Sequence, residues 1–147
     1  MQATDEDYHR TVRQFQKIAR WMMQGRDIDL KDLDLTSIQA DALMFFDKHP
    51  HSQINGLRDH LSVSHQAACG LVDRMRSKGL LNVEVSDEDA RARRVSLSME
   101  GEKTCRELRK RGASAGHAAF DCLTEKEMSD LAETLNRIEA HMKKDWK

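Results

Sequence analysis

Two short segments of the chain carry side chains suited to pairing with flat, polar or anionic partners. The first segment contains Ser64, His65, Gln66, Gly70, Arg74 and Arg76. The second contains Asp89, Arg91, Arg93 and Arg94. A glutamine amide pairs with adenine edges, an arginine guanidinium pairs with guanine or a phosphate, and histidine can contact either. These residue types together favour nucleic-acid binding, provided that the fold presents the two segments on one side.

Signals for other chemistry are weak. The chain has no G-x-S-x-G element, P-loop or dinucleotide fingerprint, so we do not expect an enzyme. Its seven histidines are scattered without metal-ligand spacing, and we expect no metal and no cofactor.

The three cysteines, Cys69, Cys105 and Cys122, show no CxxC spacing, which fits a reducing cytoplasm and incidental thiols. The alternative is a redox role, because an oxidised Cys69 within the first segment would disturb binding.

Length and composition favour one cytoplasmic domain. The chain has 147 residues, 33% of them charged, and a mean hydropathy of −0.73. It contains no apolar run long enough for a membrane span and no secretory signal at its start. The net charge of −1 does not by itself indicate a nucleic-acid binder, but a whole-chain sum can hide a local basic patch.

Helical periodicity dominates the first half of the chain. Apolar residues from Tyr8 to Met22 predict a helix over 8–24 that ends at Gly25, followed by a charged connector over 26–34. Thr36 with Gln39 forms a capping-box pattern for a second helix, which stops near Pro50. A short helix is predicted over 53–60.

A tight turn over 61–64 precedes a helix over 65–78, with Ser64 as its cap and Gly79 as its stop. Ala67, Ala68, Leu71, Val72 and Met75 form the apolar stripe of this helix, which turns the first segment outward.

The pattern then changes to that of a hairpin. Residues 80–85 and 95–97 have strand composition, and the charged stretch 86–94 between them indicates an exposed tip that holds Arg91, Arg93 and Arg94. We expect Asp89 to pair with Arg91. Helical signals return after Ser98, a possible cap, and run towards Phe120 through two weak points, Gly112 and Gly116. Thr124 with Glu127 caps a last helix whose apolar stripe is Met128, Leu131, Leu135, Ile138 and Met142.

This order predicts a mainly α fold with a small β-hairpin wing, that is, a winged helix-turn-helix flanked by further helices. Its recognition helix, 64–78, would face a major groove, and its wing arginines would face a minor groove.

The sequence resembles the MarR family of transcription regulators. The resemblance lies in the wing stretch 80–101, which contains an acidic turn, Asp89-Ala90-Arg91 and Leu97-Ser98-Met99-Glu100-Gly101. It extends to 71–75 and 78–80 at the end of the recognition helix, and to Leu35-Thr36 with Gln39. Two positions depart from the family pattern. Ser62 stands where glycine is common, which suggests a slightly strained turn, and Ala90 stands where a second arginine is common.

The resemblance implies a homodimer that binds double-stranded DNA at a pseudo-palindromic operator, with half-sites about one helical turn apart. It implies a single domain, 1–147, in which 31–100 is the DNA-binding lobe and 5–30 with 101–147 are dimerisation helices. Arg91 would enter the minor groove with Asp89 as its partner. It also suggests a small-molecule effector, and Trp21, Met22, Met44 and Phe45 are candidates for its pocket by architecture alone.

The leading hypothesis is therefore a ligand-responsive repressor. Its competitors are a thiol-based redox regulator and a winged-helix module that binds proteins instead of DNA.

Overall fold

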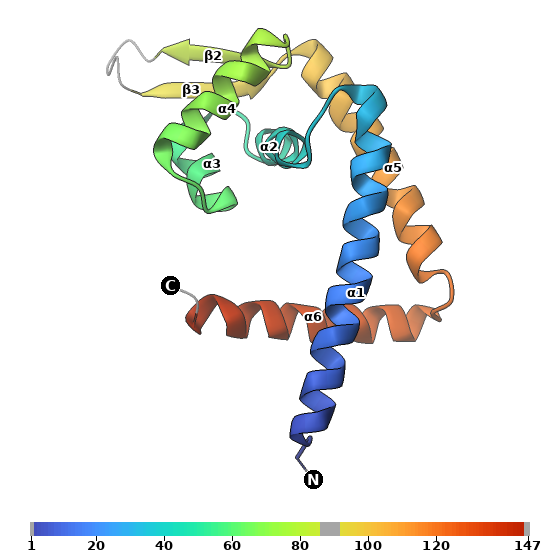
Figure 1. The fold of residues 1–147 in the computed structure, drawn as a ribbon. Coiled ribbons are helices and arrows are strands. Elements are labelled where there is room, and N and C mark those ends of the chain that lie inside the picture. The colour runs from blue at the N-terminus through green and yellow to red at the C-terminus, as the bar shows by residue number, and fades with distance from the viewer. Residues whose placement is uncertain (1, 86–91, 146–147) are drawn as a thin grey trace. The chain divides into compact units, whose positions relative to one another are not determined.

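The fold is mainly helical with a small antiparallel sheet (Figure 1). The computed structural model describes residues 2–85 and 92–145. Its elements are α1 (Asp5–Leu30), the 3-10 turn η1 (Lys31–Leu33), α2 (Ser37–Lys48), β1 (Ser52–Gln53), α3 (Ile54–Leu61), α4 (His65–Ser77), β2 (Leu81–Val85), β3 (Arg93–Leu97), α5 (Met99–Phe120) and α6 (Glu125–Asp145). The predicted class, helical with a β-hairpin wing formed by β2 and β3, is confirmed.

Helices α2 to α5 and strand β3 all contribute side chains to one hydrophobic core. The largest fully buried side chains are Leu43 and Phe46 of α2, Leu57 of α3, Val72 and Met75 of α4, Val95 of β3 and Cys105 of α5. Burying one such aliphatic or aromatic side chain contributes about 1.5–3 kcal/mol, so these residues fix how the short elements pack. The sequence places Ala67 on the buried stripe of α4, but Ala67 is exposed. The buried residues of α4 are Ala68, Leu71, Val72 and Met75.

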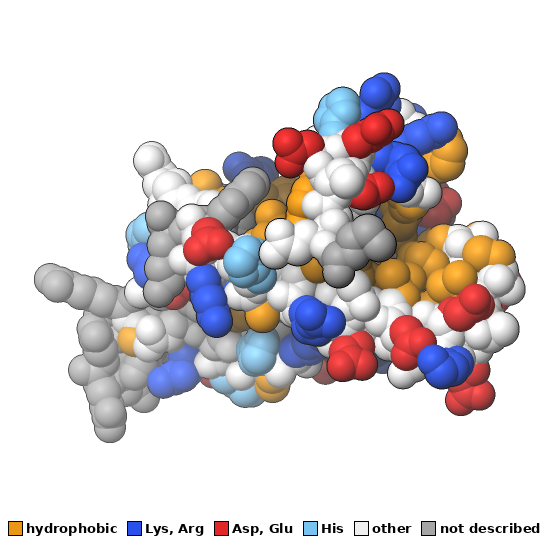
Figure 2. Space-filling view, turned by 90° about the horizontal axis from the view of Figure 1, so that it is seen from below, with side chains coloured by type: hydrophobic (Ala, Val, Ile, Leu, Met, Phe, Trp, Pro, Cys, Tyr) orange, Lys and Arg blue, Asp and Glu red, His pale blue; other side chains and the backbone are white. Residues whose placement is uncertain are grey.

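Other large apolar side chains remain at the surface, where Figure 2 shows them among charged ones. Those on α1 and α6 are Tyr8, Val12, Phe15, Ile18, Trp21, Met22, Met23, Ile28, Met128, Leu135, Ile138 and Met142, each with at least 38% of its surface exposed. Isolated exposed apolar residues are ordinary, but two helices that each carry a row of them have an unsatisfied apolar face.

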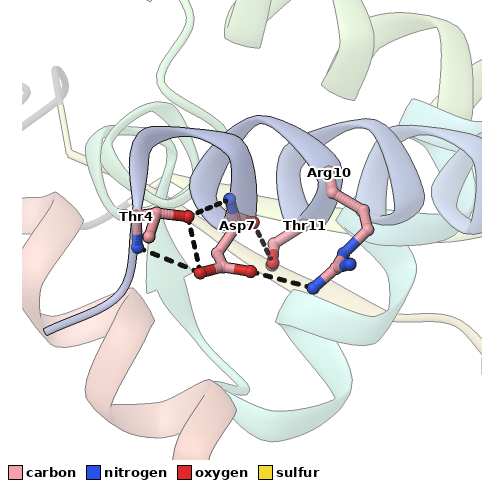
Figure 3. Close-up of polar contacts among 4 residues, drawn as sticks. All are labelled: Thr4, Asp7, Arg10 and Thr11. Atoms are coloured by element: carbon pink, nitrogen blue, oxygen red, sulfur yellow. Dashed lines mark hydrogen bonds and ion pairs between the residues drawn. The ribbon is translucent and has the colours of Figure 1, made fainter. Parts of the chain in front are cut away.

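The first helix is longer than its sequence pattern predicts. It begins at Asp5, because Thr4 and Asp7 form a capping box in which the Asp7 amide donates to Thr4 Oγ1 over 3.2 Å (Figure 3). Hydrogen bonds from the Thr4 hydroxyl, and then from its backbone amide, hold the pKa of the Asp7 carboxyl below its usual value. This contribution of the cap to stability is therefore present above the ordinary pKa of aspartate and is lost as the pH falls through the lowered pKa.

The predicted end of this helix at Gly25 is wrong, since α1 continues to Leu30. Glycine costs a helix about 1 kcal/mol relative to alanine, and tertiary contacts outweigh that cost here. The Arg26 guanidinium lies 2.6 Å from the Asp41 carboxylate of α2, and Leu30 is only 3% exposed. The predicted charged connector therefore begins as helix.

The sheet has a third strand that the sequence does not indicate. Its order is β1-β3-β2, with Ser52 opposite Val95 and Leu81 opposite Leu97. Because β1 occupies Ser52–Gln53, the short helix begins at Ile54 and not at Gln53. A strand of two residues carries no alternation that a pattern could reveal.

The chain forms two compact units, and the boundary between them lies within α5, between Leu108 and Arg109. The first contains α1, the sheet and α2 to α4, and the second contains the end of α5 and α6. Helix α5 runs unbroken through Gly112 and Gly116. In α6 the predicted cap is confirmed, because the Glu127 amide donates to Thr124 Oγ1 over 3.2 Å.

The base of the wing is closed by a set of contacts that we call the wing clamp, formed by Gly79, Leu80, Ser98 and Gly101. The Ser98 amide donates to the Leu80 carbonyl over 3.0 Å, and the Ser98 hydroxyl donates to the Gly79 carbonyl over 2.6 Å. The same hydroxyl oxygen caps α5 by accepting from the Gly101 amide at 3.0 Å. A Cβ at Gly101 would lie 2.1 Å from the Leu80 oxygen, so only glycine fits against this backbone.

We expect Gly101→Ala to lower the free energy of unfolding by about 1–3 kcal/mol, because backbone must move to admit the methyl group. Urea unfolding followed by circular dichroism measures the loss. Gly25→Ala is the matched control, since a Cβ there meets nothing within 4 Å and should stabilise α1 by about 1 kcal/mol. Equal stability of the Gly101→Ala protein and the wild type would contradict the steric argument.

Candidate nucleic-acid interface

Helices α3 and α4 are joined by a tight turn that fixes where α4 begins. Ser62 has a φ of 55°, which is a left-handed backbone conformation that glycine adopts more easily than serine. This conformation agrees with the slight strain that the sequence analysis expects in the turn. Ser64 caps α4 as predicted, because its Oγ accepts from the Ala67 amide at 3.1 Å. Two serines therefore define the turn: the backbone reverses at Ser62, and the side chain of Ser64 caps the start of α4.

The outward face of α4 carries the side chains of the first segment. His65, Gln66, Arg74 and Arg76 are exposed, and Gly70 is half-buried. Neither the Arg74 nor the Arg76 guanidinium has an ion-pair partner among the described residues. A Cβ at Gly70 would lie 3.5 Å from Arg74 Nη1, which is ordinary contact, so an alanine would fit there within this chain. Among the described residues, this face thus carries polar side chains and two unpaired guanidinium groups.

The end of α4 is attached to the rest of the unit by Lys78. Its ammonium donates to Gln39 Oε1 over 3.1 Å and to the Asp34 backbone carbonyl. Gln39 is 6% exposed and also completes the capping box of α2, as predicted, by accepting from the Thr36 amide at 3.2 Å. The side-chain oxygen of Gln39 thus accepts two hydrogen bonds, and it connects the end of α4 to the start of α2.

Two of the predicted wing arginines, Arg93 and Arg94, lie in a strand and not at the hairpin tip. They belong to β3, where they pair with Val85 and Glu84. The Arg94 guanidinium donates to the His51 backbone carbonyl over 3.2 Å. The Arg93 guanidinium lies 4.0 Å from the Asp73 carboxylate, which connects the wing to α4. Asp89 and Arg91, with their predicted pairing, lie outside the described residues.

An open cavity of about 550 Å³ lies between the start of α3, α4 and the wing. Its lining residues are Gln53, Ile54, Asn55, His65, Cys69, Asp73, Ala92 and Arg93. His65 Nδ1 is 3.0 Å from Asn55 Oδ1, and His65 Nε2 is 3.4 Å from Cys69 Sγ. The sequence analysis missed Asn55, because a contact across ten positions and a turn leaves no local pattern.

The residues suggested for an effector pocket are only partly brought together. Met44 and Phe45 line a cavity of about 130 Å³ with Asp41, Lys48, His49 and His60. Trp21 and Met22 are 60% and 45% exposed on α1 and line neither of the two cavities. Of the four residues suggested for the pocket, two therefore share a cavity and the two on α1 do not line it.

Two further features of the described residues narrow the chemistry of the site. No three histidine, cysteine or acidic side chains within 2–85 and 92–145 are grouped so that they could hold a metal ion. Over the same residues, no helix is both long enough and apolar enough to cross a membrane.

Comparison with known proteins gives a match to one family. Residues 33–92 match the model of the MarR family. The match contains the helix-turn-helix and the first strand of the wing. The resemblance noted in the sequence is therefore confirmed over the turn, α4 and the start of the wing. No curated protein matched the chain in a sequence search.

Solved structures share the fold beyond the matched segment. The transcriptional regulator SlyA is 22% identical, with a TM-score of 0.82 and 97% of each chain covered. The MarR family regulator AbsC from Streptomyces coelicolor is 19% identical, with a TM-score of 0.81 over 97% of this chain and 98% of its own. MepR from S. aureus, in complex with DNA, is 19% identical, with a TM-score of 0.74 over 87% of this chain and 93% of its own. At these identities the likeness shows a common fold.

The strain in the turn is open to a direct test. We expect Ser62→Gly to raise the free energy of unfolding by about 1 kcal/mol, because glycine adopts a positive φ without the clash of a Cβ. Ser64→Gly, the same substitution two positions later, should lower it by a few tenths, roughly the cost of glycine at an N-cap. Urea unfolding of both variants measures the two changes. A loss of stability in Ser62→Gly would contradict the assignment of strain to this turn.

Proposed function

We propose that the protein is a transcription regulator that binds double-stranded DNA through its winged helix. The observation that carries the proposal is the outward face of α4, where exposed hydrogen-bonding and cationic side chains stand opposite a buried apolar stripe. An α-helix with such a face fits the major groove, where base edges can be distinguished. The structure of MepR, which shares this fold, contains DNA and supports the same use of the fold here.

Each group on this face has a role suited to its chemistry. Ser64, His65 and Gln66 stand at the start of α4, the end of a recognition helix that reaches base edges. Arg74 and Arg76 bind phosphates, since no carboxylate of the described residues neutralises them. Gly70 has no side chain, so DNA can approach the backbone of α4 closely in the middle of this face.

The wing adds a second contact in this proposal. By resemblance to the family, Arg91 enters the minor groove and Asp89 orients it. A narrow minor groove has a strongly negative potential that attracts arginine. Arg93 and Arg94 act differently, because both guanidinium groups already contact the protein, and they hold the wing beside α4 and β1.

The regulator acts as a homodimer. The exposed apolar rows of α1 and α6 cover parts of the two terminal regions, 5–30 and 101–147, that the family resemblance assigns to dimerisation. A second copy of the chain would bury these rows, and a two-fold axis would present two copies of α4 to successive turns of the duplex. The lobe over 31–100 then contacts the operator, in the cytoplasm.

A small-molecule effector would act through the distance between the two copies of α4. A ligand that binds one dimer state better shifts the population towards that state, and a state with misplaced helices releases the operator. The expected outcome is repression relieved by the ligand. A protein-binding module without DNA affinity is the competing function, and it gives the opposite result in the binding experiment below.

The first experiment measures fluorescence anisotropy with duplex DNA from upstream of the protein's own gene at several salt concentrations. Wild type should bind with an affinity that falls steeply as salt rises, because phosphate contacts release counterions. Arg74→Ala should weaken binding about tenfold and reduce the slope of log affinity against log salt by about 1. Arg91→Ala should act in the same direction.

Lys126→Ala is the matched control. It removes one positive charge from α6, outside the winged helix, and it should leave the salt slope unchanged. Failure of wild type to bind either this DNA or random duplex at low salt would refute the regulator function and favour a protein partner.

The homodimer has a separate test in sedimentation velocity. Wild type should sediment at twice the chain mass of 16.9 kDa, and Ile138→Glu should shift the protein to monomer, because the dimer would bury an unpaired carboxylate. Ser129→Glu introduces the same charge on the opposite side of α6, and it should leave the dimer intact. A monomeric wild type, or dissociation by both substitutions alike, would contradict this interface.

A further inference from the structure

Lys78 is the C-cap of α4, and its ammonium is turned towards the protein. Its Nζ donates to Gln39 Oε1 over 3.1 Å and to the backbone carbonyl of Asp34. The Asp34 carboxylate lies 3.6 Å from the same nitrogen. An ammonium has three donors, and three protein oxygens lie around this one. We call Asp34, Gln39 and Lys78 the polar node.

The place of Lys78 in the sequence would assign it to DNA. It follows Arg74 and Arg76, which lie in the last turn of α4 and suit phosphates. Among the described residues those two guanidinium groups have no ion-pair partner, whereas Lys78 contacts oxygens of two other segments. Three cations that are close in sequence therefore divide into two that are available to a phosphate and one that the fold uses.

The partner of Lys78 on α2 cannot itself touch a duplex. Gln39 is only 6% exposed, and its side-chain oxygen also accepts from the Thr36 amide at 3.2 Å. It lies in the first turn of α2, far from Lys78 in sequence. A buried polar group that loses a partner is costly, which favours the ammonium in this position. The contact therefore fixes the end of α4 against the start of α2.

The third member of the polar node has an uncommon backbone conformation. Asp34 has a φ of 52° and a ψ of 42°, in the left-handed region that residues other than glycine adopt at a cost. It follows η1 and precedes the cap of α2. Because its carbonyl accepts from Lys78, the same ammonium that holds α4 also supports the junction between η1 and α2.

We propose that Lys78 is a positioning residue for DNA binding, which sets the orientation of α4 through Gln39 and Asp34 and contacts no phosphate. This role rests on the function proposed above. Without the ammonium, the end of α4 can shift on α2, and only a fraction of the molecules then presents the face of α4 as the duplex requires. The apparent affinity falls by that fraction, so a tenfold loss corresponds to about one competent molecule in ten.

Fluorescence anisotropy at several salt concentrations separates positioning from contact. Lys78→Met keeps a long side chain and removes the ammonium. It should weaken binding about tenfold and leave the slope of log affinity against log salt unchanged, because no phosphate contact is lost. Arg74→Ala is the comparison, and it should reduce the slope by about 1. A similar reduction in Lys78→Met, or an unchanged affinity in that variant, would overturn the proposal.

The buried partner gives an independent test. Gln39→Met should weaken binding by about the same factor as Lys78→Met, and the double variant should bind no more weakly than either single variant. Gln39→Glu keeps an oxygen for both the ammonium and the Thr36 amide, so it should restore binding to the wild-type level. Losses that simply add in the double variant would show that Gln39 and Lys78 act separately.

Thr36→Ala is the matched control for a loss of stability. It removes the hydroxyl that accepts from the Gln39 amide at 3.3 Å, and it retains the backbone amide that bonds to the Gln39 side chain. Thr36→Ala should lower the urea midpoint of unfolding and leave the DNA affinity unchanged. An equal loss of affinity in Thr36→Ala and Lys78→Met would show that stability, and not position, determines binding.

Hydrogen exchange of the full-length protein without DNA keeps the two proposals apart. In Lys78→Met, amides of residues 34–39 and of the end of α4 should both exchange at least about threefold faster, while those at the start of α4 should not change. If this pattern is found but wild type binds no DNA, the polar node stands and the regulator function fails. If wild type binds DNA but exchange in Lys78→Met is unchanged or faster at one segment alone, only the positioning role fails.

Discussion

The close approach of Gly101 to the Leu80 carbonyl is the contact on which the arrangement of α4 and the wing depends. At this point α4 has ended at Ser77, β2 is about to begin at Leu81, β3 has finished at Leu97 and α5 starts at Met99. One hydroxyl, that of Ser98, donates to Gly79 and caps α5, while its amide closes the hairpin. Apart from the Ser98 hydroxyl these groups are backbone atoms, and they hold the end of α4, the base of the wing and the start of α5 together.

A second contact holds the same end of α4 from the other side. Lys78 reaches the buried amide of Gln39 and the carbonyl of Asp34, so η1, α2 and α4 share one polar node. Arg93 adds the third constraint, between β3 and α4. These contacts hold the C-terminal end of α4, and the arginines that sequence alone assigns to DNA divide into two groups. Arg74 and Arg76 have no ion-pair partner among the described residues, whereas Arg93 and Arg94 contact other parts of the fold.

What the sequence predicts correctly here is chemistry confined to a few neighbouring positions. The capping boxes at Thr36 and Thr124, the cap at Ser64 and the strained turn at Ser62 all depend on groups within about one helical turn. The errors come from contacts between distant segments. Gly25 continues a helix because Arg26 meets Asp41, and Asn55 enters the site only because α3 folds back on α4. The two-residue strand β1 exists only as the partner of β3. Neither packing nor pairing across the fold leaves a periodic signal.

Hydroxyl-radical footprinting shows whether two copies of α4 bind two half-sites on one duplex, as the proposed function requires. With DNA from upstream of the gene, we expect protection that is symmetric about one point, with two half-sites centred about 10–10.5 base pairs, or one helical turn, apart. The footprint should disappear when excess specific duplex competes. A single unpaired protected segment, or no protection at low salt from a protein shown to be folded and dimeric, would refute binding by two copies of α4.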